Sequence, residues 1–221
     1  MESMRKNSLK RIVGTVGTIL IVGIFWTMSF AGMSAKDMSN QALQECHEGR
    51  SGTVHAVQLA HYQRARTLAE QAIALDDGIA DGHFALFCAI GEKMRLDGEV
   101  LSSIFEFRRM MTALDRTLEL NPNHLDALSS KGTILVKLPR LLGGDSEKGE
   151  QMLRQVIQRD PKAINARLVL AKTYADRGSI QEALDYALQA LRLAQDQHRR
   201  DLIPEAQATV SDLRSSYPTS H

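Results

Sequence analysis

Aromatic residues and prolines are scarce in this sequence. Only 5% of its 221 residues are aromatic, and it has five prolines. Strands favour aromatic and β-branched residues, whereas Ala, Leu, Gln, Arg and Glu, which recur throughout, favour helices. Four of the prolines fall between the expected helical stretches, where a residue that cannot continue a helix does no damage. The composition predicts an all-α chain.

The chain also lacks a marked excess of either charge. Its net charge is +1, and four basic residues against one acidic residue give positions 1–35 a net charge of +3, so the remainder carries about −2. Proteins that bind nucleic acid present a basic face. The near-neutral body therefore argues against a nucleic-acid partner.

The basic N-terminus leads into an uncharged, mostly apolar stretch at residues 12–33. A helix needs about 20 apolar residues to cross a bilayer, whereas the apolar part of a secretory signal has roughly 7–15 residues. Residues 1–35 therefore form either a cleaved signal peptide or a retained membrane anchor, and both alternatives stay open. In both cases residues 36–221 are expected on the exported side of the cytoplasmic membrane, periplasmic and either anchored or released.

A repeated helical pattern follows, and it is clearest over residues 164–197. Spacings of three and four place residues on one helical face. Here they select apolar and small side chains on two successive helices, separated by Gly178 and Ser179. The residues that share this register are Leu170, Ala171, Tyr174, Ala183, Ala187 and Ala190.

Earlier units are longer but end in similar ways. Asp76-Asp77, Asn121-Pro122 and Asp160-Pro161 each close a predicted helix. Two further features are expected: close helix packing at Gly132, and helix caps at Thr53 and at Asp145 or Ser146. The expected domain, 36–221, has about four helix pairs and a capping helix at 199–215. Its earlier helices are predicted at 38–48, 53 onward, 80–92, 107–120 and 125–138, with one more starting after Gly144. Among these, 80–92 and 107–120 are expected to form one pair.

This spacing resembles the tetratricopeptide repeat family, whose 34-residue units are helix pairs. The resemblance implies a right-handed superhelical array that follows the N-terminal apolar helix and binds proteins without catalysing a reaction. The insertion at residues 138–145, with its Leu-Gly-Gly-Asp turn, also looks like the T component of tripartite ATP-independent periplasmic transporters. That weaker resemblance implies an oligomeric transporter accessory protein.

The first helices of stacked pairs line the concave side of such an array. We therefore expect a groove for a protein or peptide partner, with a second copy of the chain as another possible partner. The mixture of polar, charged and apolar groups suits an extended peptide or a helix. The predicted groove residues are Asp81, Phe84 and Cys88, then Asp126, Ser129, Thr133 and Lys137, then Asn165, Leu168, Lys172 and Asp176.

No pattern predicts a cofactor, a metal site or catalysis. Spacings of eight and six separate His47, His55 and His61, whereas ligands on one helical face need three or four. Cys46 and Cys88 are either two independent thiols or a disulfide in an oxidising compartment. An envelope enzyme embedded in the array, with residues such as His55, His61 and His83, remains the alternative from another class.

Overall fold

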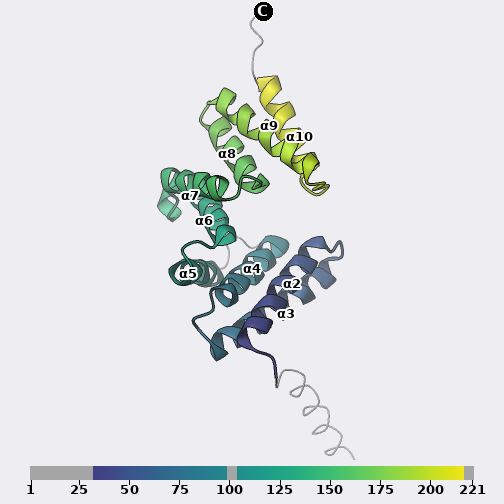
Figure 1. Cartoon of the computed structure of the whole chain (residues 1–221), viewed down its shortest axis with the longest axis vertical. Helices are drawn as coiled ribbons and strands as arrows, with labels where there is room; N and C mark the ends of the chain where they lie inside the picture. The colour runs from purple at the N-terminus through teal and green to yellow at the C-terminus, as the bar shows by residue number, and fades with distance from the viewer. Residues whose placement is uncertain (1–31, 99–103, 217–221) are drawn as a thin grey trace, which may run out of the picture. The chain divides into compact units, whose positions relative to one another are not determined.

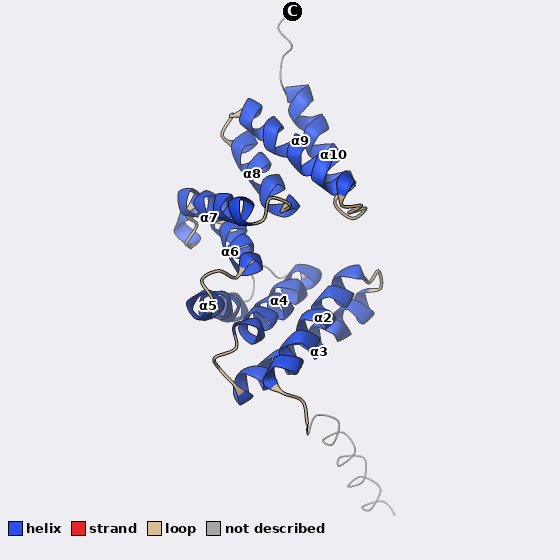
Figure 2. Ribbon diagram, in the orientation of Figure 1, coloured by secondary structure: helices blue, strands red, loops and turns tan. Residues whose placement is uncertain are grey.

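The computed structural model describes residues 32–98 and 104–216. These residues form nine α-helices and one short 3-10 helix joined by turns, without any strand (Figures 1 and 2). Contacts divide the chain into two compact units, residues 1–100 and 101–221. The all-α prediction is confirmed, and the superhelical arrangement stays a prediction.

The apolar stretch 12–33 lies almost wholly outside the described residues. Whether it is a signal peptide or an anchor therefore stays a prediction. Within residues 32–98 and 104–216, no helix combines the length and the apolar character that crossing a membrane requires.

The first unit contains helices α2 (Ala35–Ser51), α3 (His55–Leu75) and α4 (Ala80–Asp97), and each packs against the other two. Ser34 caps α2 by accepting a hydrogen bond from the backbone N–H of Asp37 at 3.1 Å. The expected cap at Thr53 is wrong. Val54 occupies the N-cap position of α3, where no side-chain hydrogen bond forms.

The second unit contains α5 (Ile104–Leu120), α6 (Leu125–Lys137), α7 (Ser146–Arg159), α8 (Ile164–Asp176), α9 (Ile180–Asp196) and α10 (Ile203–Ser216). Helices α6 and α7 form one pair and α8 and α9 the next, while α10 packs on both α8 and α9. The sequence placed α4 and α5 in one pair. In the structure, α4 packs within the first unit, and α5 belongs to the second and contacts α6.

The pair α6 and α7 is closely packed where two glycines meet. A Cβ atom at Gly132 would lie 2.9 Å from the carbonyl oxygen of Gly149, and a Cβ at Gly149 would lie 2.7 Å from that of Gly132. Neither carbonyl can move without distorting its helix. The expected close-packing role of Gly132 is confirmed, and Gly149 supplies the matching surface on α7.

Alanine performs the same task between α8 and α9. Ala183 and Ala187 have no exposed surface and share a core cluster with Leu170 and Tyr174. Ala190 is equally buried, and it packs with Ala206 of α10 in a neighbouring cluster. The helical register predicted for residues 164–197 therefore corresponds to the observed core.

The turns that follow α3, α5 and α7 share one local structure. Asp76, Asn121 and Asp160 each follow the last residue of a helix, and each side chain accepts a hydrogen bond from the backbone N–H two residues later, at 2.9, 3.1 and 2.9 Å. Their backbone carbonyls also accept from the residue three positions on. These Asx turns satisfy backbone N–H groups of the connecting turns and aim the chain toward the next helix.

The Leu-Gly-Gly-Asp turn is explained by backbone geometry. The 3-10 helix Arg140–Leu142 ends at Gly143, whose φ of 90° strongly favours glycine. At Gly144 a Cβ would lie 1.8 Å from the carbonyl oxygen of Leu138. Asp145 then caps α7 by accepting from the backbone N–H of Lys148 at 3.0 Å, as one of the two expected caps.

We predict that Ala187→Leu lowers the free energy of unfolding by about 1–3 kcal/mol, because the added carbons enter a filled contact between α8 and α9. Thermal or urea melts followed by circular dichroism measure this loss. The matched control is Ala208→Leu on the exposed side of α10, which should melt like the parent. Coincident melts of parent and Ala187→Leu would show that the assigned contact is incorrect.

Candidate protein-binding surface

Helix α6 carries the most open part of the predicted groove. Asp126 and Lys137 are exposed near its two ends, and Ser129 and Thr133 are half-buried between them. These four residues follow spacings of three and four, so they form one stripe about 16 Å long. Within the described residues, neither Asp126 nor Lys137 has an ion-pair or hydrogen-bond partner for its side chain. We call these four residues the α6 stripe.

The corresponding stripe on α8 is partly covered by the capping helix. Leu168 is 3% exposed and lies in a core cluster with Ala206 of α10, so its expected place on an open groove is wrong. Lys172 forms an ion pair with Glu205 of α10 at 2.6 Å. Asn165 and Asp176 remain exposed at the two ends of this stripe. Helix α10 thus closes the middle of the α8 surface.

The first unit positions its predicted groove residues differently. Asp81 and Phe84 are half-buried, and Phe84 stacks on Phe87 with ring centroids 5.7 Å apart. Cys88 is 6% exposed and belongs to the core between the helices, so its expected role as an accessible groove residue is also wrong. Both corrections concern apolar side chains, for which burial is the more favourable location.

A buried carboxylate links α7 to α8, and the sequence analysis did not identify it. Glu150 is 4% exposed and pairs with Arg154, with 3.1 Å between Nη2 and Oε2, and also with Arg177. Arg154 donates a hydrogen bond to the hydroxyl of Tyr174 and lies 5.8 Å from the centroid of that ring. The i,i+4 spacing of Glu150 and Arg154 was the available signal.

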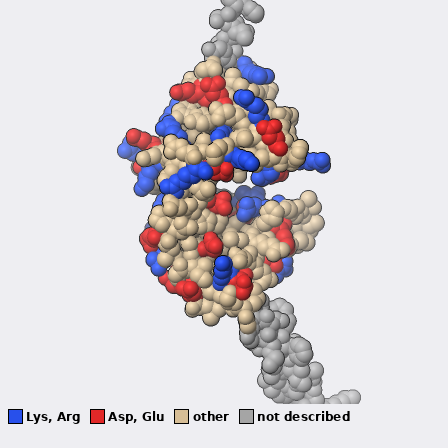
Figure 3. All heavy atoms as spheres, viewed as in Figure 1, with Lys and Arg blue, Asp and Glu red and all other residues tan. Residues whose placement is uncertain are grey.

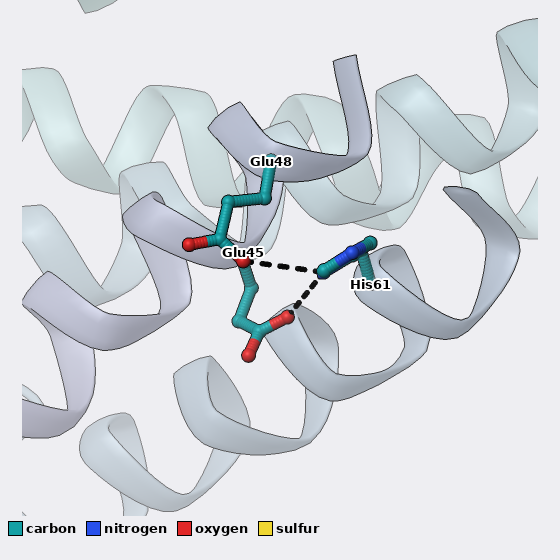
Figure 4. A group of neighbouring side chains, drawn as sticks. All are labelled: Glu45, Glu48 and His61. Atoms are coloured by element: carbon teal, nitrogen blue, oxygen red, sulfur yellow. Dashed lines mark hydrogen bonds and ion pairs between the residues drawn. The ribbon is translucent and has the colours of Figure 1, made fainter. Parts of the chain in front are cut away.

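Three potential metal ligands meet between α2 and α3, although the sequence predicted no metal site (Figure 4). Nδ1 of His61 lies 2.7 Å from Oε2 of Glu45 and 3.6 Å from Oε2 of Glu48. The guanidinium of Arg64 also contacts this group, with its Nε 3.0 Å from Oε2 of Glu45 and its Nη2 2.8 Å from Nδ1 of His61. Because the guanidinium of Arg64 already pairs with Glu45, we interpret the group as an ion-pair network that joins two helices.

Both charge signs are interspersed on the face shown in Figure 3, where Lys and Arg alternate with Asp, Glu and uncharged residues. The view shows no broad patch of a single sign on either unit. This face therefore resembles neither the basic footprint of a nucleic-acid-binding protein nor an acidic one. It suits a partner that carries both signs.

Comparison with solved structures reveals similar helical proteins. MamA of AMB-1 is 18% identical, with a TM-score of 0.50 over 81% of this chain and 99% of the other. MamA from Desulfovibrio magneticus RS-1 is 15% identical, with a TM-score of 0.47 over 81% and 98%. YrrB, described as a TPR protein with an unusual peptide-binding site, is 17% identical, with a TM-score of 0.38 over 77% and 99%. No protein-family model and no curated protein sequence matches the chain.

The chain has the tetratricopeptide-repeat fold. The helix pairs, the alanine register of residues 164–197 and the similarity to MamA of AMB-1 agree on this point. At this level of identity the similarity concerns the fold alone. It does not support the resemblance to the T component of tripartite transporters, which stays a prediction.

We predict that Lys172→Glu destabilises the packing of α10 on α8 by up to about 1 kcal/mol, because it replaces a half-exposed ion pair with two facing carboxylates. Urea unfolding at low ionic strength measures the change. The charge-swapped variant with both Lys172→Glu and Glu205→Lys should recover most of the loss. If it is no more stable than the single variant, the pair does not hold the capping helix.

Proposed function

We propose that this protein is a non-catalytic scaffold of the cell envelope that binds a protein or peptide through the concave side of its helix pairs. The tetratricopeptide-repeat fold supports a scaffold, since stacked helix pairs expose extended surfaces that such proteins use for binding. The N-terminal basic cluster and apolar stretch support the envelope location.

The observation that carries the binding proposal is the α6 stripe. Unpaired charges of opposite sign stand near its two ends, and two hydroxyl-bearing residues lie between them. Thr133 donates to the backbone carbonyl of Ser129, so that hydroxyl still has lone pairs to accept a hydrogen bond. An extended peptide could therefore pair with both charges and donate hydrogen bonds between them. Helix α8 packs beside α6 and extends the surface with Asn165 and Asp176.

Structural roles for the interhelical charged groups support binding rather than catalysis. Glu150 is held by two arginines, and Glu45 lies between His61 and Arg64. Each group joins two neighbouring helices. A general acid or base needs instead an accessible atom that faces a substrate. These contacts account for the carboxylates without a reaction.

We expect the export proposal to be visible with topology reporters. A reporter that is active only in the periplasm, fused after His221, should work, whereas a reporter that is active only in the cytoplasm should not, because the basic N-terminal end stays inside. Release of the body by osmotic shock would indicate cleavage, and retention would indicate an anchor. The reverse pattern of reporter activity would contradict the export proposal.

We predict that Lys137→Glu weakens partner binding by roughly 2–5-fold without changing the fold, since one exposed charge contributes about 0.5–1 kcal/mol. Partners captured from envelope extract by immobilised parent protein are identified, and their affinities for both forms are measured. The matched control is Lys148→Glu, an equal charge change on exposed α7 outside the stripe. Recovery of the chain itself would identify a homo-oligomer. Equal affinities for parent and Lys137→Glu would exclude the α6 stripe as the binding site.

A further inference from the structure

Both cysteines of the chain meet inside the first unit. Cys46 lies on α2 and is fully buried, while Cys88 lies on α4 and is 6% exposed. They share a small core cluster with Ala65 and Ala89. The two helices pack directly against each other, although α3 separates them in sequence. Sγ of Cys46 points to the backbone of α4, 4.0 Å from the carbonyl oxygen of Ala85, one turn before Cys88.

The two sulfur atoms are also in unequal surroundings. The neighbouring Cys46 thiol, followed by the charge of Arg50, lowers the pKa of Cys88, whereas the neighbouring sulfur of Cys88, together with burial, raises the pKa of Cys46. Arg50 extends from α2 and places Nη2 3.2 Å from Sγ of Cys88. Its Nε lies 3.3 Å from Oε1 of Glu92, which fixes the guanidinium beside the sulfur.

We propose that Cys46 and Cys88 are a redox-active dithiol that closes into a disulfide between α2 and α4 by exchange with an external disulfide. In the reduced state, both cysteines are free and lie in the same core cluster. Cys88 is the attacking residue, because Arg50 donates a hydrogen bond to its sulfur and its surroundings open toward solvent through the half-exposed Arg50. Cys46 is the resolving residue.

The exchange balances in two steps. First, the thiolate of Cys88 attacks one sulfur of the external disulfide, which forms a mixed disulfide and expels one thiolate. Cys46 then transfers its proton to that leaving group and attacks Sγ of Cys88, which forms the internal disulfide and expels the second thiolate. The second thiolate takes up from solvent the proton that Cys88 released when it ionised. The protein loses two electrons and two protons, and the external disulfide is reduced to two thiols.

This disulfide would link α2 covalently to α4. The bond joins residues 46 and 88, so it closes a long loop and restricts the unfolded chain strongly. The ion pair of Arg50 with Glu92 and the hydrogen bond of Arg50 to Cys88 already connect the same two helices. Oxidation therefore converts an existing contact into a covalent one. It changes the rigidity of the first unit without requiring a new fold.

The test treats the folded full-length protein with excess oxidised glutathione, traps remaining thiols with iodoacetamide and determines intact mass and cross-linked peptides. The expected product is a monomer without alkylated cysteine, in which the peptides containing residues 46 and 88 are joined. Its melting temperature should exceed that of the reduced protein by at least about 5 °C. Reduction with dithiothreitol should reverse both changes.

Single variants separate the two roles. Cys46→Ser should stop at a stable glutathione adduct on Cys88, whereas Cys88→Ser should react many-fold more slowly. Arg50→Gln should slow formation of the internal disulfide several-fold but leave the same product. Circular dichroism confirms that each variant is folded, and Ala variants replace any Ser variant that is not. Thiols that stay alkylatable in the native protein, or disulfide-linked dimers as the main product, would overturn the proposal.

Discussion

The close approach of paired helix backbones is the constraint on which the second unit depends. At Gly132 and Gly149 each backbone carbonyl occupies the space of the other residue's absent side chain. Ala183 and Ala187 achieve a similar approach with a single methyl group each. Because dispersion attraction requires contact at about 4 Å, small side chains allow two helices to pack tightly without aromatic residues. This explains how the second unit packs its helices closely in a chain with only 5% aromatic residues.

The turns between helices set where and how each following helix begins. The Asx turns at Asp76, Asn121 and Asp160 have nearly the same hydrogen bonds, so the helices that follow them, α4, α6 and α8, start from similar geometry. The longer connection between α6 and α7 uses a different device, with Gly143 and Gly144 reversing the chain and Asp145 capping the next helix. In both kinds of turn the polar side chains form hydrogen bonds within the turn itself. The exposed residues on the helices are therefore the groups that can contact a partner.

The two units differ in which charged and polar groups lie between their helices. In the second unit, Glu150 is buried with Arg154 and joins a pair of helices through charge-assisted hydrogen bonds. In the first unit, Arg50 reaches a pair of thiols, and the ion-pair network of Glu45, Glu48 and His61 with Arg64 lies between α2 and α3. The proposed scaffold role needs helix contacts that persist while the outer surface binds and releases partners. Interhelical charges, and in the first unit a pair of thiols, provide contacts that ionic strength or redox conditions can adjust.

The sequence by itself determined the helical class, the pairing of α8 with α9, the packing role of Gly132 and the positions of most turns. Each of these follows from local spacing or from the conformational limits of one residue type. Only the tertiary structure decided which face each helix leaves open. Leu168 and Cys88 share a stripe with polar residues, but α10 covers the first and α2 the second. Contacts between distant residues also decided three further features. They place α4 and α5 in different units, bring Cys46 next to Cys88 and bury Glu150. Such contacts depend on how whole helices pack, and no local spacing encodes them.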